Sequence, residues 1–459
     1  MSNEAKVEKK KLNLFDIFCL GYGGAIGSGI FVLTGIGIAF TGRSIVLVVL
    51  VGSLFMMLAY FFNILLSSMF KFRGGDYSQK AVCFNPFFTG FAAYLTIING
   101  FGLAMFSVAV IDYASVIFPG LIQLKTLWSI LLTTVIFSTS LRGTKFVAVL
   151  NNIMIVIMLA VIALFIFLGF TRVQPGYFRP EGFFTGGVKG FFAAIAIMGW
   201  ACQGTTFAPV AVGAVTKNAR RTIPFGILIG TVALGITYAL MVYVAAGVLP
   251  LEQVAGQKLS VVAQAIFPYW VFVIFIMGGA VFAIATSMVG GVAMVRYPIL
   301  KIAEDGWLPK VFTRTTSTGY PWVGYILYYL VSTIPVLLGF SLSALVSFAM
   351  IPFMIMNIYL NLACIGIVKK YPEQWKKSIL HMPSPFIKIV CVLAAICSGI
   401  VCYNLFKELE PRAMVFMLGV LTVIGVASLV VLKTGAVKKE ELEANKKAIL
   451  EEAFKEEED

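Results

Sequence analysis

The sequence has few charged residues for its length. Lys, Arg, Asp and Glu make up 12% of the 459 residues, while 60% of the residues are hydrophobic. Soluble globular proteins are about 45–50% apolar and about 25% charged, so this chain cannot cover a water-exposed surface of the required size. The composition excludes a soluble, disordered or coiled-coil protein and predicts a polytopic membrane protein. The apolar runs are continuous and do not alternate with polar residues, which favours helices over a transmembrane β-barrel.

Patterns typical of catalysis and of metal binding are also missing. The single histidine, His381, argues against a histidine-rich metal site and against a Ser-His-Asp triad. The pattern GxxxxGK[ST] is absent, which excludes a P-loop ATPase and ATP as the direct energy source. The seven cysteines form no CxxC pair, and we interpret most of them as small buried side chains. We expect no enzyme activity, no cofactor and no metal apart from a coupling cation.

The hydropathy pattern predicts an all-α polytopic membrane protein with twelve transmembrane helices. A span needs about 20 predominantly apolar residues, and short connections with glycine and proline turns separate the apolar runs. Residues 433–459 are rich in Glu, Lys and Ala and predict a charged tail, either a solvated helix or disordered. The predicted spans are approximately 13–38, 44–69, 86–117, 126–140, 144–169, 187–213, 223–248, 268–299, 321–339, 342–367, 385–405 and 412–432.

The basic residues predict the orientation of the chain. When residues 1–12 are placed in the cytoplasm, a clear majority of the Lys and Arg residues fall in cytoplasmic segments, as the positive-inside rule requires. The formal net charge of +14 is therefore a topology signal spread over many loops, and it does not indicate a nucleic-acid partner. We expect a multi-pass protein of the plasma membrane whose termini are both cytoplasmic.

The first predicted span contains a segment that a continuous helix tolerates poorly. Five of the nine residues 21–29 are glycine, and each glycine costs roughly 1 kcal/mol relative to alanine inside a helix. An unpaired backbone amide in hydrocarbon costs several kcal/mol more, so the segment predicts a break that faces a cavity or a ligand. The half-helix after the break would present free N–H groups, which suit a carboxylate. The alternative is a close helix crossing at small residues.

The sixth predicted span holds a second interruption. Residues 198–209 combine two glycines, a glutamine, two threonines and a proline near the middle of the span, and Pro209 lacks a backbone donor. Breaks in the first and sixth spans are typical of an inverted-repeat transporter with its site at the repeat interface. The two five-helix repeats would be 13–169 and 187–367, with 385–432 as helices 11 and 12.

Four motifs lie in the first span and in the loops after spans 2, 6 and 8. They are GAIGSGIF at 24–31, GGDY at 74–77, KNARRTIP at 217–224, and RYP followed by EDGWLP within 296–309. In this order they are similar to motifs of the amino acid–polyamine–organocation superfamily of secondary transporters, and the resemblance covers nearly the whole chain. The resemblance implies a 5+5 inverted repeat followed by two further helices.

The resemblance also implies a substrate site at the two breaks. In the family, the carboxylate of an amino acid binds backbone amides of the first span, which are here those of Gly27, Ser28 and Gly29. The amino group binds carbonyls of the sixth span and of the first break, here about Gly24, Ala25 and Ile26. The candidate wall in the sixth span consists of Gly199, Trp200, Ala201, Cys202, Gln203, Gly204, Thr205 and Thr206.

The sequence departs from the family at a position linked to ion coupling. In the fifth span, Met158 stands where many members carry a lysine, so we expect no lysine-based proton relay there. In the eighth span, Thr286 and Ser287 are adjacent hydroxyl residues. Sodium-coupled members of the wider fold use such a pair with carbonyls of the first span, and these are suitable hard oxygen ligands. The alternative is that both hydroxyls bond to their own helix.

Charged residues are almost absent from the span interiors, apart from Asp112 near the outer end of the third span. A charged substrate needs a counter-charge within the membrane. The sequence therefore predicts alternating-access transport of small or medium neutral amino acids by H⁺ or Na⁺ symport. An obligate exchanger, and a nutrient sensor or channel on the same fold, are the alternatives. Three polar residues within the spans are expected to form interhelical hydrogen bonds more readily than ligand contacts. They are Asn99, Asn357 and Asn361.

Overall fold

The computed structural model describes residues 11–72, 79–80, 82–83, 85–140, 144–213, 216–316 and 319–455. Within these ranges the chain is built from helices and contains no β-strand, only an isolated bridge between Leu12 and Thr216. The predicted all-α class is therefore confirmed. The GGDY motif at 74–77 lies outside the described residues.

The helices before the second break are α1 (Leu14–Ala25), α2 (Ser28–Thr41), η1 (Gly42–Ser44), α3 (Ile45–Ala59), α4 (Phe61–Met69), α6 (Pro86–Ile98), α7 (Gly100–Ile117), η2 (Pro119–Leu124), α8 (Lys125–Ser140), α9 (Thr144–Phe170), α10 (Pro180–Phe183) and α11 (Gly187–Cys202). The helices from the second break onward are η3 (Gly204–Thr206), α12 (Ala208–Ala211), α13 (Ala219–Gly247), α14 (Leu251–Val254), α15 (Leu259–Ile266), α16 (Tyr269–Ile274), η5 (Phe275–Val281), α17 (Phe282–Met294), α18 (Arg296–Glu304), η6 (Lys310–Thr313), α19 (Trp322–Leu337), α20 (Leu342–Lys370), α21 (Pro372–Lys377), α22 (Ser384–Lys407), α23 (Pro411–Lys433) and α24 (Lys439–Lys455).

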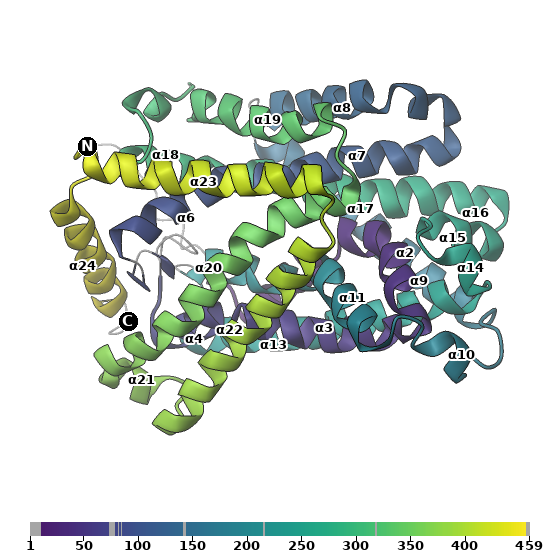
Figure 1. The fold of residues 1–459 in the computed structure, drawn as a ribbon, viewed down its shortest axis with the longest axis horizontal. Coiled ribbons are helices and arrows are strands. Elements are labelled where there is room, and N and C mark those ends of the chain that lie inside the picture. Colours follow the sequence, from purple (N-terminus) through teal and green to yellow (C-terminus); the bar gives the residue numbers. More distant parts are fainter. Residues whose placement is uncertain are drawn as a thin grey trace.

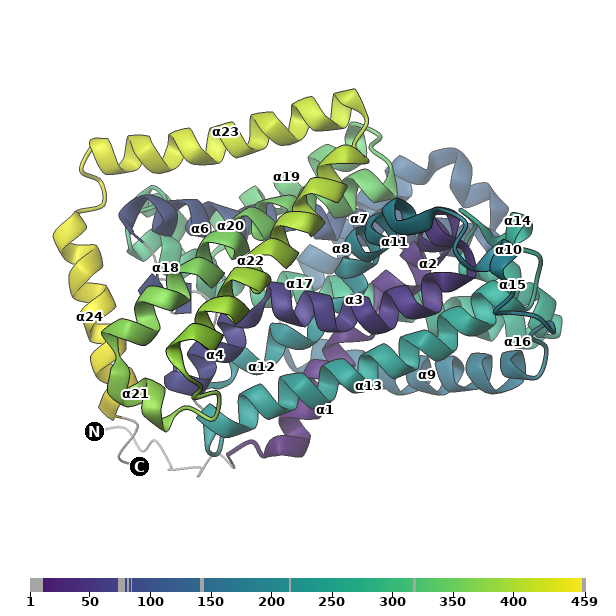
Figure 2. The same cartoon turned by 60° about the horizontal axis from the view of Figure 1, so that its bottom comes forward.

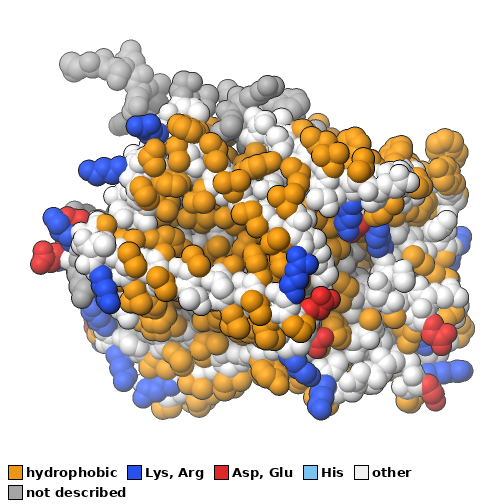
Figure 3. All heavy atoms as spheres, turned by 45° about the horizontal axis from the view of Figure 1, so that its top comes forward, with side chains coloured by type: hydrophobic (Ala, Val, Ile, Leu, Met, Phe, Trp, Pro, Cys, Tyr) orange, Lys and Arg blue, Asp and Glu red, His pale blue; other side chains and the backbone are white. Residues whose placement is uncertain are grey.

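The length and composition of these helices fit a membrane protein. Nine helical segments among the described residues are long and apolar enough to cross a membrane. Three shorter apolar helices are α1, α11 and α19, and the first two are parts of the broken first and sixth spans. Figure 3 shows a broad area of hydrophobic side chains on one face, with most charged side chains outside it. The protein is thus polytopic, and the count of twelve crossings stays a prediction.

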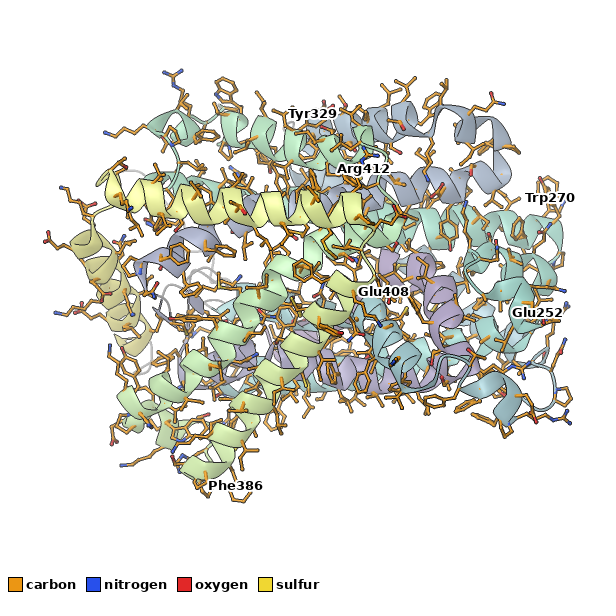
Figure 4. All side chains as sticks on the ribbon, in the orientation of Figure 1. Glu252, Trp270, Tyr329, Phe386, Glu408 and Arg412 are labelled. Atoms are coloured by element: carbon orange, nitrogen blue, oxygen red, sulfur yellow. The ribbon has the colours of Figure 1, made fainter. Side chains whose placement is uncertain are left out.

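The bundle has two distinct ends. Helices α18, α21 and α24 lie at one end, and α10, α14 and α15 lie at the other (Figure 1). Figure 4 places Glu252 and Trp270 at the second end, where Tyr269 and Trp270 are 65% and 77% exposed. Exposed aromatic side chains beside charged ones are typical of a membrane–water interface. In the proposed orientation this second end is the external one.

The second predicted span is interrupted as well, at Tyr60 between α3 and α4, which the sequence analysis did not predict. The Nδ2 atom of Asn361 donates to the carbonyl of Ala59 at 2.9 Å, and its Oδ1 accepts the N–H of Phe62 at 3.0 Å. The hydroxyl of Ser398 donates to the same Ala59 carbonyl at 3.1 Å. Backbone groups that the break frees are therefore satisfied by α20 and α22, and the interhelical role expected for Asn361 is confirmed.

The third and eighth predicted spans are not continuous α-helices, and the tail helix is not fully solvated. The third span is divided between α6 and α7 at Asn99, and the eighth contains the π-helical turn η5. The charged tail forms α24, and its Leu450 and Ala453 side chains are buried. One side of the tail helix is therefore packed, while the sequence analysis expected a solvated helix or a disordered end.

Candidate functional site

The break expected in the first span is present at Ile26 and Gly27. Helix α1 ends at Ala25, and Ile26 follows with an extended backbone, φ −71° and ψ 104°. Helix α2 begins at Ser28, and Gly27 supplies no side-chain cap to it. The first N–H groups of a helix have no acceptor within that helix. The amides expected to bind a carboxylate therefore start a new helix inside the bundle.

The second break lies directly against the first. A β-carbon on Gly29 would lie 2.6 Å from the Cα atom of Ala201, and one on Gly204 would lie 2.7 Å from the Cα atom of Ala25. Contacts this short leave no room for a side chain, so glycine at both positions lets the backbones of α2 and α11, and of α1 and η3, touch. Both interpretations of the glycine-rich segment apply: it is a helix break and also a close crossing.

The two sides of the first break are packed differently. On the α1 side, Gly24 is exposed, and no atom lies within 4 Å of a β-carbon placed on Gly23. On the α2 side, Gly27 and Gly29 are buried and closely covered by α17 and α11. Figure 2 shows α1 at the lower margin of the bundle. Among the described residues, the glycines near the end of α1 are therefore less covered than those near the start of α2.

The hydroxyl pair of the eighth span lies beside the first break. A β-carbon on Gly27 would overlap the Oγ atom of Ser287 on α17. The hydroxyls of Thr286 and Ser287 both donate to the carbonyl of Ala283, at 2.9 and 3.0 Å. Both hydroxyl hydrogens are thus used within their own helix, which leaves oxygen lone pairs as the groups that a cation would contact. The position of Ser287 agrees with the expected site, and cation binding itself stays a proposal.

The candidate residues of α11 point in several directions. Gly199 faces the Sδ atom of Met56 and the Cε atom of Met350, at 2.9 and 3.1 Å from a placed β-carbon. Cys202 is buried and its Sγ atom lies toward Gly52 of α3. Ala201 is the α11 residue that meets Gly29 of the first break.

Trp200 projects toward α7. Its ring lies 2.8 Å from a β-carbon placed on Gly102 and 5.9 Å, centroid to centroid, from the ring of Phe106. The side chain is half-buried. Gly102 therefore makes room for the indole, a role that the sequence analysis did not assign to it.

Two of the three polar residues of the second break bond to side chains outside it, and the third bonds within it. Tyr60 donates to Oε1 of Gln203 at 2.8 Å, and the hydroxyl of Thr206 donates to the carbonyl of Gln203 at 2.8 Å. The hydroxyls of Thr205 and Thr231 lie 2.7 Å apart. All three side chains are buried. Gln203 thus connects the second break to the α3–α4 junction, and Thr205 connects it to α13.

A buried tyrosine that gave no signal in the sequence contacts the first break. The hydroxyl of Tyr238, on α13, donates to the carbonyl of Ala25 at 2.9 Å. Tyr22 forms a separate hydrogen bond with Thr237 at 2.7 Å. A single tyrosine in an apolar run gives no pattern from which its partner is predictable. Tyr238 thus donates to a carbonyl at the end of α1, directly beside the break.

A bundle of apolar helices with two breaks in contact defines a polytopic membrane transport protein. The model of one protein family, described as amino acid permease, matches residues 12–427. The chain belongs to this family, within the amino acid–polyamine–organocation superfamily. The family assignment expected from the four motifs is therefore confirmed.

Individual relatives differ in what their names describe. The chain is 26% identical to the branched-chain amino acid permease of Bacillus subtilis over 330 residues, which cover 67% of this chain and 70% of that protein. It is 28% identical to the methylthioribose transporter of the same organism over 340 residues, 68% of this chain and 71% of that protein. A segment of 130 residues, 28% of this chain and 29% of the relative, is 32% identical to the cadaverine/lysine antiporter of Escherichia coli.

Proposed function

We propose that this permease carries small or medium neutral amino acids by alternating access, in symport with H⁺ or Na⁺. The observation that supports the proposal is the contact between the two breaks: Gly29, near the start of α2, packs against Ala201 of α11, and Gly204 of η3 packs against Ala25 at the end of α1. Amides suit the carboxylate of an amino acid and carbonyls suit its ammonium group. In this proposal both ends of the chain are cytoplasmic and the membrane is the plasma membrane.

The distribution of charge supports a neutral side chain on the substrate. The sequences of α2, η3 and α17 contain no Asp, Glu, Lys, Arg or His. Asp112, near the far end of α7, is bonded to Lys125 at 2.8 Å. A charged substrate would therefore lack a counter-charge beside the break. The name of the branched-chain amino acid permease also supports this choice.

The proposal is tested by uptake into proteoliposomes that contain the purified protein. The panel comprises alanine, valine, leucine, lysine, glutamate and methylthioribose, each offered with a Na⁺ gradient, a H⁺ gradient or neither. We expect saturable uptake of one or more of the neutral amino acids, in preference to lysine and glutamate. Preferential uptake of lysine, glutamate or methylthioribose would contradict the substrate assignment. Steady conductance without saturation would indicate a channel.

An obligate exchanger is the second candidate. It is favoured by the segment that is 32% identical to an antiporter. The same vesicles separate the two mechanisms, because an exchanger takes up labelled substrate only when unlabelled substrate is present inside. A symporter accumulates substrate in empty vesicles when an ion gradient is applied.

Sodium coupling gives a separate prediction. If Ser287 and Thr286 contribute to a Na⁺ site, replacing Na⁺ with choline should lower the initial rate of uptake by at least about tenfold, since a cation bound beside the break would stabilise substrate binding. The measurement is uptake at fixed pH in the two salts, and Thr286→Val is the matched variant. Equal rates in both salts would refute Na⁺ coupling and leave H⁺ as the proposed ion.

The hydrogen bond from Tyr238 predicts a defect in substrate affinity. In Tyr238→Phe the carbonyl of Ala25 loses its buried donor, and an unsatisfied buried group costs about 1–3 kcal/mol, so we expect KM to rise by roughly 5- to 150-fold. Tyr22→Phe is the control, because it removes a hydrogen bond between the same two helices away from the break. If both variants changed KM equally, a positioning role for Tyr238 would be wrong.

A further inference from the structure

The segment between α13 and α16 lies against the outer end of the first span. Within residues 251–266, the N–H of Gly256 donates to the carbonyl of Gly35 at 2.7 Å. The carbonyl of Gln257 fills the space where a side chain on Gly35 would stand. Gly35 belongs to α2, the half-helix whose first amides form the candidate site. The segment 251–266 is thus bound to the helix that must move if the site opens to this end.

A buried tyrosine of α7 joins the same two elements. The hydroxyl of Tyr113 donates to the carbonyl of Phe31 on α2 and accepts the N–H of Leu259 on α15 at 3.2 Å. The side chain is 2% exposed. One phenolic group is therefore shared by α2, α7 and the segment 251–266, and it fixes all three in one arrangement.

The residue before this tyrosine adds an ionic connection. Asp112 is 6% exposed. Lys258 of the segment donates to its backbone carbonyl at 2.7 Å and lies 4.0 Å from its Oδ1 atom. Lys125 binds its Oδ2 atom at 2.8 Å. Partial burial lowers the pKa of Lys258, and the charge of Asp112 acts in the opposite direction.

The two lysines differ in what they connect. Lys125 begins α8, which packs along α7, so its ion pair stays within the α7–α8 unit. Lys258 belongs to the segment 251–266, so its contacts cross from that segment to α7. Removing either lysine takes one positive charge from Asp112, but only removal of Lys258 also breaks contacts between the segment 251–266 and α7. This difference provides a matched pair of variants.

We propose that Asp112, Tyr113 and Lys258 form an outer latch that holds the segment 251–266 closed over α2. The latch must open whenever the candidate site opens to this end of the molecule. Its role in transport rests on the proposed alternating-access function. A substrate that arrives from this end binds only molecules with an open latch, so its apparent affinity is reduced by the fraction of open molecules.

The transport test compares Lys258→Gln with Lys125→Gln in proteoliposomes. Lys258→Gln should lower the half-saturating concentration on the latch side by about 3- to 10-fold, since the open fraction rises. On the opposite side the half-saturating concentration should rise. Lys125→Gln should not lower the value on the latch side, because Asp112 then has Lys258 as its remaining partner. Equal shifts in both variants would indicate a general charge effect and overturn the proposal.

Hydrogen–deuterium exchange tests the latch without any transport assay. The N–H groups of Gly256 and Leu259 are protected by their bonds to α2 and Tyr113. Lys258→Gln should speed their exchange by about 3- to 10-fold and Lys125→Gln should leave it unchanged, since exchange follows local opening. Unchanged exchange in Lys258→Gln would overturn the latch even if the protein transports amino acids. Absence of uptake with the expected exchange would overturn only the proposed function.

Discussion

Replacing Gly29 with alanine is expected to lower amino-acid uptake by about 5- to 150-fold, because overpacking of this kind costs about 1–3 kcal/mol. The added methyl group would lie 2.6 Å from both the Cα and the Cβ atom of Ala201 and 3.0 Å from its backbone nitrogen. Backbone atoms cannot rotate away as a flexible side chain does, so α2 or α11 must shift. A shift of α2 displaces the amides that we propose as the carboxylate site.

The matched control is Gly23→Ala, in the same glycine-rich segment. No atom lies within 4 Å of a β-carbon at that position, and alanine favours a helix over glycine by about 1 kcal/mol. We expect uptake within about threefold of the wild type and an unchanged or slightly higher Tm, since the change meets no neighbour. Measuring Tm and uptake for both variants separates a local defect from misfolding. Wild-type substrate affinity in a folded Gly29→Ala variant would contradict the assignment of the α2 amides.

The sequence predicted the breaks in the first and sixth spans because their causes are local. Glycine and proline change the backbone at their own positions, so the composition of residues 21–29 and of residues 198–209 is enough to predict a helix break in each segment. The break at Tyr60 has a different origin. Its freed backbone groups are satisfied by Asn361, 299 residues from Phe62, and no local pattern at Tyr60 indicates that partner. The sequence predicts an interhelical hydrogen bond for Asn361, but it does not indicate which helix that bond reaches.

For a related reason, the sequence predicted the part of the candidate site in the first span better than the part in the sixth. Positions along the chain place Gly27, Ser28 and Gly29 at the start of a half-helix, and the structure has α2 beginning there. The rotation of α11 about its axis depends on packing, so the sequence did not show which of its residues face the first break. In the structure Ala201 meets α2, while Gly199 and Cys202 face α3. Tyr238 and Gly102 were missed because their roles arise from contacts between distant helices.

The contact between Gly27 and Ser287 provides a second test of the site, in the form of a double-mutant cycle. In Gly27→Ala the new methyl group overlaps the hydroxyl of Ser287, so we expect amino-acid affinity to fall by at least about tenfold, which is 1.4 kcal/mol. Removing that hydroxyl leaves the Cβ atom of residue 287 at 3.7 Å and the carbonyl of Ala283 at 3.6 Å, both ordinary van der Waals separations. The double variant Gly27→Ala, Ser287→Ala should therefore regain most of the affinity that Gly27→Ala loses.

The reference for that recovery is Ser287→Ala alone. Any contribution of the hydroxyl to cation binding is lost in both Ser287 variants and cancels in the comparison, so the cycle isolates the steric contact. We expect the double variant to bind the amino acid within about threefold of Ser287→Ala, because the methyl group then meets no atom closer than the van der Waals limit. Substrate-induced thermal shifts provide the affinities. If Gly27→Ala lowered affinity by the same factor in the wild type and in Ser287→Ala, then Gly27 would act through its backbone alone. The placement of α17 against the first break would then be wrong.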